Sequence, residues 1–178
     1  VVSATSYRLD VALDNGFTSF VAGYNNLTVA TTSQSVTGLT AGTTYYYRTR
    51  AMNGTGTSAS SNTVSPPTLT IAPTATAASS ITATSFTANW GSVTGATGYR
   101  LDVALDNGFT NILSGYNNLS VATTSQSVTG LSSGTTYYYR ARGVNTSGSS
   151  ANSTSINVLL IPSAPVASAA SSVATTSF

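Results

Sequence analysis

Apolar and polar residues alternate along short stretches of the chain, with turn-forming residues between the stretches. In Ser85–Trp90, the residues Phe86, Ala88 and Trp90 would share one face. The segment 99–105 would point Tyr99, Leu101, Val103 and Leu105 inward. Alternation with period two is typical of a half-buried strand. Further strands are predicted over 75–79, 112–115, 125–128, 135–144 and 149–158. Apolar residues nowhere recur at helical spacing, so the sequence predicts no helix.

The alternating pattern occurs twice, at an offset of 92 positions. Tyr7–Phe17 recurs as Tyr99–Phe109, and later segments follow at the same offset without a gap. A fixed offset of this kind indicates repeated structural units. The predicted domains are a partial unit over 1–66, a complete unit over 67–161 and the opening strands of a third over 162–178.

The phase of the repeat favours a longer array. Trp90 belongs to a segment that, in the first unit, would lie before Val1, so the chain starts and stops inside a unit. Proteolysis or an incomplete sequence would explain this, but we favour a window onto a long polymer of similar units. Pro-bearing linkers at 66–73 and 159–165 predict semi-rigid connections, with apolar linker residues packed between neighbouring domains.

Short strands separated by turn signals every 8–12 residues predict an antiparallel sandwich. Asp106-Asn107-Gly108 is predicted to be a turn in which Gly108 supplies a positive φ. The fold class predicted for the whole chain is therefore all-β, with antiparallel sandwiches in tandem.

Several of these residues carry a resemblance to a known family. A Trp in the second strand, Tyr-x-Leu-x-Val in the third and Leu131-Ser-Ser-Gly-Thr-Thr-Tyr137 before the long strand resemble fibronectin type III repeats. The resemblance implies that Trp90, Tyr99 and Leu131 are core residues and that the Tyr137 hydroxyl bonds to backbone near Leu131. Ser133 stands where the family usually has Pro. The repeats also resemble those of secreted, Bacteroidetes-type bacterial proteins.

Charged residues make up 6% of the chain, against about one quarter in ordinary soluble domains. Lys, Glu, His and Cys are absent, and the net charge of +2 is too small and too evenly spread for a nucleic-acid surface. The apolar runs are too short for membrane insertion in this segment. A surface rich in Ser, Thr and Asn suits an extracellular or cell-surface protein.

This composition removes most of the groups that enzymes use. General acid–base catalysis relies on His, Glu, Asp or Lys, and only Asp is present. Triad chemistry lacks its His base and its Cys nucleophile, and zinc lacks its nitrogen and sulfur ligands. A calcium site near Asp14 or Asp106 is an alternative to a turn, and the turn is favoured. We therefore predict no catalytic residues, no metal and no cofactor.

The remaining candidate is a surface. Charged and aromatic residues alternate outward on two strands that neighbour each other in the resembled fold, and they form a predicted contact face. Its members are Arg8, Asp10, Tyr46, Arg48 and Arg50 in the first unit and Arg100, Asp102, Tyr138, Arg140 and Arg142 in the second. Cross-strand ion pairing with Arg stacked on Tyr would explain the pattern without a partner. A protein contact or a glycan site would explain it too.

Asn-x-Ser/Thr acceptors add candidate glycosylation sites. They are Asn26, Asn53, Asn118, Asn145 and Asn152, of which Asn53 and Asn145 are the favoured loop positions.

The function predicted from these observations is a non-catalytic structural module of an extracellular filament, stalk or adhesin. Its partners would be copies of itself, with glycans or surface proteins as further candidates, and without nucleic acid. The alternative is a binding or spacer module of a secreted multidomain protein.

Overall fold

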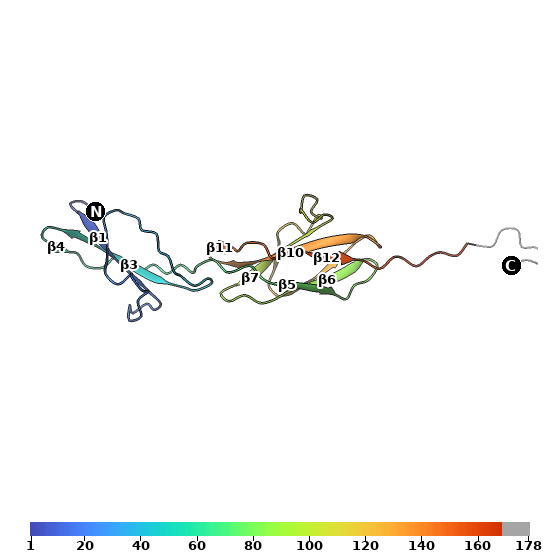
Figure 1. Ribbon diagram of the computed structural model, residues 1–178, viewed down its shortest axis with the longest axis horizontal. Coiled ribbons are helices and arrows are strands. Elements are labelled where there is room, and N and C mark those ends of the chain that lie inside the picture. The colour runs from blue at the N-terminus through green and yellow to red at the C-terminus, as the bar shows by residue number, and fades with distance from the viewer. Residues whose placement is uncertain (169–178) are drawn as a thin grey trace, which may run out of the picture.

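A computed structural model describes residues 1–168, and in that range the chain forms strands and no helix (Figure 1). The strands are β1 (Ser6–Ala12), β2 (Leu27–Val29), β3 (Tyr46–Asn53), β4 (Gly56–Thr57), β5 (Ala75–Ser79), β6 (Ser85–Trp90), β7 (Gly98–Ala104), β8 (Leu119–Val121), β9 (Ser125–Thr129), β10 (Thr136–Asn145), β11 (Gly148–Ser149) and β12 (Ile156–Leu159). The predicted all-β, antiparallel fold class is confirmed.

The second unit is a sandwich of two antiparallel sheets. One sheet has the order β5-β6-β9, and the other has the order β11-β10-β7-β8 with β12 paired to β10. Along β10 the residues are alternately buried and half-buried, so one side of the strand faces the core. The period-two pattern of the sequence therefore sets which side of each sheet is buried.

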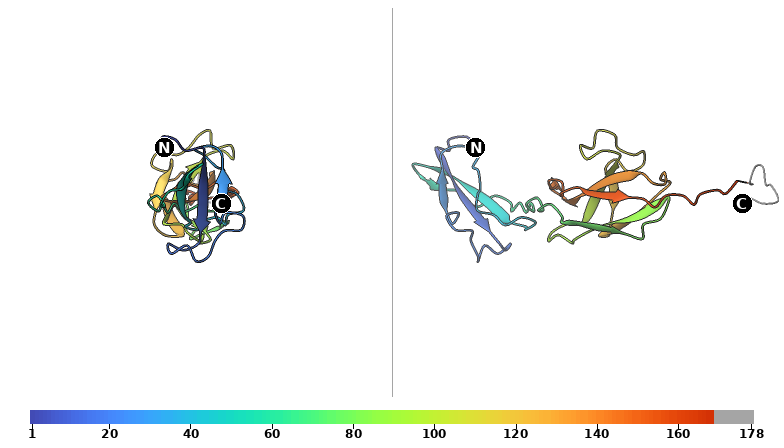
Figure 2. Two further views of the ribbon diagram at one scale, coloured as in Figure 1. Left: turned by 90° about the vertical axis from the view of Figure 1, so that its left-hand side faces the viewer. Right: turned by 45° about the vertical axis from the view of Figure 1, so that its right-hand side comes forward.

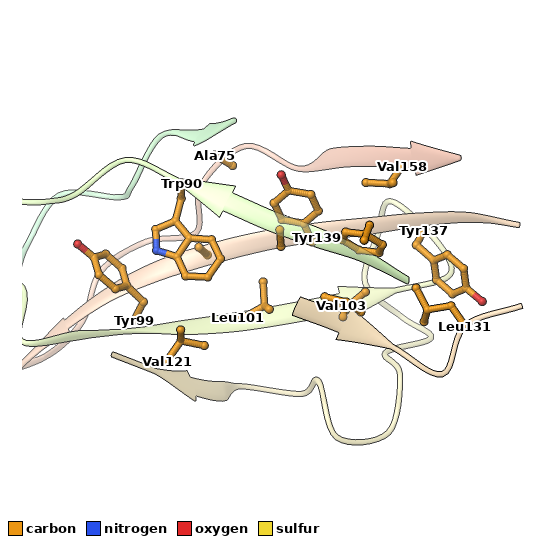
Figure 3. Packing of buried hydrophobic residues seen from close by; sticks show 14 of the residues in the cluster. Ala75, Trp90, Tyr99, Leu101, Val103, Val121, Leu131, Tyr137, Tyr139 and Val158 are labelled. Atoms are coloured by element: carbon orange, nitrogen blue, oxygen red, sulfur yellow. The ribbon is translucent and has the colours of Figure 1, made fainter. Parts of the chain in front are cut away.

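The core lies between the two sheets (Figure 3). Phe86 and Trp90 from β6 pack against Tyr139 and Tyr99 of the opposite sheet, with ring centroids 5.8 Å apart in both pairs. The Tyr139 hydroxyl donates to the carbonyl of Thr76 across the sandwich. Because the hydroxyl is satisfied in this way, so large a polar side chain tolerates complete burial.

The first unit has one sheet, of order β2-β1-β3-β4, and no second sheet covers it within the described residues. The consequence is visible in equivalent residues: Tyr47 is 38% exposed, whereas Tyr139 is fully buried. Leu9, Val29 and Val36 line an open apolar groove of about 540 Å³ on the same face.

Some sequence predictions were wrong at the ends of strands. Leu105 is 44% exposed because β7 ends at Ala104 and the chain turns outward. Within the predicted strand 112–115, only Ile112 pairs, in an isolated bridge with Ala104; β8 follows four residues later. The predicted strand 149–158 consists of two short pieces, β11 and β12.

The turn after β7 also differs from its prediction. The positive φ falls on Phe109 (56°) and not on Gly108, and the same holds for Phe17 in the first unit. The Asp106 carboxylate accepts the amides of Thr110 and Asn111, and this closes the turn from within.

The two units follow each other along one long axis, with the β4 end of the first unit and residues 160–168 at opposite ends (Figures 1 and 2). The prediction that apolar linker residues are packed between the domains was wrong for Leu69 and Ile71, which are 47% and 64% exposed, whereas the polar Thr70 is buried. No strand forms over 162–168, and the rest of the predicted third opening, 169–178, lies outside the described residues.

Candidate interaction surfaces

The predicted contact face contains a buried carboxylate. Asp102 on β7 lies opposite Arg140 on β10, and Arg142 lies opposite Arg100. Arg140 Nε donates to Asp102 Oδ2 at 2.9 Å and Arg142 Nη2 donates to Oδ1 at 3.0 Å. The Asp102 side chain is 2% exposed and the two arginines are 22–23% exposed. The strand register brings Arg100, Arg140 and Arg142 close together, and the Asp102 carboxylate reduces the repulsion among their positive charges.

Asp102 is buried because the loop between β7 and β8 folds over the outer side of the sheet. The backbone N–H of Asn118 donates to Asp102 Oδ1 at 2.8 Å, and the side-chain oxygen of Asn118 accepts from Arg142. The Phe109 ring lies under the Arg140 guanidinium, 4.0 Å from its carbon to the ring centroid. This corrects the expected stacking of Arg on Tyr and removes Asp102 from any contact face.

The first unit builds the same cluster. Arg48 and Arg50 donate to Asp10 at 3.0 and 2.9 Å, the N–H of Asn26 donates to Asp10, and Arg48 lies over Phe17. Phe17, Phe109, Asn26 and Asn118 were not predicted as members of these clusters. Their signal was present in the exact recurrence of Gly-Phe and of Gly-Tyr-Asn-Asn-Leu at the offset of 92.

The other members of the predicted face lie at its margin. Arg8 donates to Thr28 and to the sulfur of Met52, and Arg100 reaches the carbonyl of Asn118 at 3.5 Å. Tyr46 and Tyr138 are half-buried, with no side-chain hydrogen bond in the described part of the chain. The groups of this face that a partner could contact are therefore Tyr46, Tyr138 and the exposed parts of the arginine side chains.

The turns that begin the covering loops are held by acidic side chains. Backbone N–H groups of Thr110 and Asn111 stabilise the ionised form of Asp106 and lower the pKa of its carboxyl; Thr18 and Ser19 lower the pKa of Asp14 in the same way. Since these carboxylate oxygens already accept hydrogen bonds from backbone N–H groups, their role is to stabilise the turn. No group of three or more acidic, His or Cys residues gathers anywhere in residues 1–168.

The glycosylation candidates differ in accessibility. Asn145 is 6% exposed and its amide donates to the carbonyl of Thr68 at 2.8 Å, so the preferred position in the second unit is closed to modification. Asn53, its equivalent, is exposed, as are Asn152 and the loop residues Asn26 and Asn118. Asn26 and Asn118 also accept from arginines through their side-chain oxygens.

The expected corner tyrosine has a defined partner. The Tyr137 hydroxyl accepts the backbone N–H of Ser132 at 3.0 Å, next to Leu131, and Tyr45 accepts that of Thr40 at 2.9 Å. Trp90, Tyr99, Leu131 and Tyr137 are all less than 9% exposed. A sandwich with a buried Trp on one sheet and a tyrosine corner on the other combines features of the immunoglobulin-like folds.

The fibronectin type III domain model matches residues 71–158. Residues 71–158 have the fibronectin type III fold. The match falls within the predicted unit 67–161. It includes the buried Trp90 of one sheet and the tyrosine corner at Tyr137 of the other. Fibronectin type III domains commonly serve as structural or binding modules of multidomain proteins and are generally non-catalytic.

Solved structures with fibronectin type III domains are similar to the chain. A two-domain segment of chicken tenascin is 22% identical, with 89% of this chain and 86% of that one covered and a TM-score of 0.49. The FN1–FN3 domains of chicken CNTN1 are 15% identical, with 88% and 56% covered and a TM-score of 0.45, so the chain spans just over half of that fragment. None of the curated proteins compared with the chain matches it.

No helix in residues 1–168 has the length and apolarity that crossing a membrane requires. Fibronectin type III domains are typically found in extracellular or surface-associated proteins.

Proposed function

We propose that the chain is a non-catalytic structural module of an extracellular filament, stalk or surface adhesin built from tandem repeats. The observation that supports it is the way each unit uses its charges. In the described residues the four aspartates bond to arginines or to backbone amides of their own unit. Few charged groups therefore remain for catalysis or ligand binding. The two units are joined end to end, as a module of a filament requires.

Tandem arrangement gives such a module an advantage. Each added domain lengthens the molecule, and one solution to the interdomain contact is used again at every junction. A polymer of this kind needs neither a cofactor nor a catalytic residue.

Electron microscopy of native material tests the proposal. Fibres with an axial repeat of one domain, about 35–40 Å for a sandwich with strands of about ten residues, are expected. Separate short particles that bind polysaccharide on a glycan array would overturn it in favour of a binding or spacer module.

The exposed margin of the arginine face supports that second candidate. Tyr138 and Arg100 are half-buried members of this margin, and neither bonds to Asp102. Replacing both with Ser leaves the buried ion pairs intact, so loss of binding to glycans or surface proteins would be assigned to the face itself. Unchanged behaviour would restrict the cluster to a role in folding.

A further inference from the structure

The two units meet at a joint in which the linker lies against the β10–β11 hairpin. The Asn145 amide donates to the carbonyl of Thr68 at 2.8 Å, and the Ser147 hydroxyl donates to that of Pro67 at 2.5 Å. Gly143 faces Thr70, whose hydroxyl would lie 2.7 Å from a Cβ at residue 143. Side-chain hydrogen bonds to two successive linker residues fix the direction of the linker.

A second part of the joint brings two loops into backbone contact. Gly42 has a φ of 64° and lies against Thr94 and Gly95, and a Cβ on Gly95 would be 2.1 Å from the Gly42 carbonyl oxygen. Only glycine at both positions allows this approach.

The linker side of this joint recurs at the far end of the second unit. The N–H of Gly42 donates to the carbonyl of Leu69, and in the same way the N–H of Gly134, with a φ of 63°, donates to that of Ile161. Leu159 and Ile161 are 63% and 53% exposed. We call residues 132–135 and 159–162 the plug.

The hairpin side recurs at the opposite end of the molecule, on the β3–β4 hairpin (Figure 1). Asn53 is the equivalent of Asn145 and accepts the N–H of Thr55 as Asn145 accepts that of Ser147, but its amide nitrogen has no partner in the described residues. A hollow of about 360 Å³ lies beside it, lined by Val1, Val2 and Met52 among others. We call residues 1–4 and 51–58 the socket.

Plug and socket differ from the existing joint at paired positions. Pro162 stands where the joint has Thr70, and Ala51 stands where it has Gly143. In the joint, the Thr70 hydroxyl leaves no room for a methyl group at residue 143. Pro162 has no hydroxyl, so the methyl group of Ala51 does not meet one. One mismatch remains: Ser3, with a φ of 66°, replaces Gly95 and carries a Cβ at the position of closest approach.

From this correspondence we propose that the plug of one chain docks into the socket of a second copy of the same chain. The contact repeats the intramolecular joint: Asn53 donates to the Leu160 carbonyl as Asn145 donates to that of Thr68, and Ile161 lies beside Gly56 as Leu69 lies beside Gly148. The interface is heterologous, so each added chain leaves a plug and a socket free, and the assembly grows as a filament. The proposal rests on the proposed function and names its partner.

Sedimentation velocity of the 178-residue chain over a wide concentration range tests the proposal. We expect concentration-dependent growth beyond the dimer, abolished by Ile161→Asp in the plug or by Asn53→Arg in the socket. Leu105→Asp is the matched control, because Leu105 is an exposed apolar residue outside both surfaces. Ser3→Gly removes the one mismatch and should lower the concentration at half-assembly by tenfold or more.

Mixing separates this arrangement from a symmetric dimer. Ile161→Asp retains its socket and Asn53→Arg retains its plug, so the two monomeric variants together should form dimers and nothing larger. A monomeric chain at every concentration, with Ser3→Gly as well, would overturn the proposal, and so would assembly that ignores the plug and socket substitutions. Native fibres seen by microscopy with no assembly of this chain would leave the proposed function intact and reject the plug–socket contact alone.

Discussion

A carboxylate as deeply buried as that of Asp102 is stable in its ionised form only when donors surround it. Here the donors are Arg140, Arg142 and the N–H of Asn118. The arginines in turn are held in place by Phe109 and by the side chain of Asn118. The carboxylate therefore fixes the loop between β7 and β8 to the outside of the sheet.

Replacing Asp102 with Asn should destabilise the second unit by about 3 kcal/mol, since two partly buried guanidinium groups would lose their counter-charge. Urea unfolding followed by Trp90 fluorescence reports on this unit alone, because Trp90 is the only tryptophan. Asp10→Asn, the same change in the first unit, is the matched control and should leave that transition unchanged. A loss below about 0.5 kcal/mol would show that the arginines are solvated well enough without Asp102.

The turn at Asp106 should open in acid. Its pKa is lowered in the folded protein by the amides of Thr110 and Asn111, so the stabilisation is complete above the unfolded value of about 3.9 and is lost as the pH falls through the folded value. NMR titration of the two amides below pH 4 measures the loss. In Asp106→Asn the acid-dependent shift of these amides should vanish, and its persistence would assign the titration to another group.

At the scale of elements, one segment occurs twice with identical sequence and two structures. Thr-Thr-Ser-Gln-Ser-Val-Thr-Gly-Leu spans 31–39 and 123–131. In the second unit its middle forms β9, which pairs with β6, for example at Phe86↔Val128. In the first unit the equivalent residues form no strand. The strand therefore depends on its partner and not on local propensity.

The same dependence explains how much the sequence could predict. β6, β7 and β10 were predicted within a residue or two because each carries its own alternation of buried and exposed positions. β8 was missed because three residues are too few for a pattern. The covering loop, with Asp102 beneath it, follows from the tertiary path of residues 105–118, about which local alternation contains no information.

A peptide with the sequence of residues 73–91 should bind the open groove of the first unit. The face it would meet has Tyr7, Leu9, Val29 and Val36 where the second unit has the identical residues packed on β5 and β6. Hydrogen exchange of the amides in 33–37 is expected to slow at least tenfold as this segment becomes a strand. A peptide with Asp at the positions of Phe86 and Trp90 is the control, and equal exchange with either peptide would contradict the prediction.

At the scale of the whole molecule, the joint determines whether the units behave as one rod. Its linker contacts involve Asn145, Ser147 and the buried Thr70, and its loop contact is the approach of Gly42 to Gly95. Neither contact contributes to the core of either unit. The orientation of the units can therefore be changed separately from their stability.

Gly95→Ala should release the joint while both units stay folded. The new Cβ would overlap the Gly42 carbonyl, and since both partners are backbone, only separation of the loops relieves the overlap. Gly130→Ala is the matched control, because Gly130 has nearly the same φ, 75° against 74°, and nothing within 4 Å of a Cβ. Both variants carry the backbone strain of an alanine at positive φ, so the difference between them isolates the contact.

Small-angle X-ray scattering should show a rigid rod for the control and a broader, shorter distance distribution for Gly95→Ala. Identical scattering from the two variants would mean that the linker contacts of Asn145 and Ser147 hold the units in line without the glycine pair.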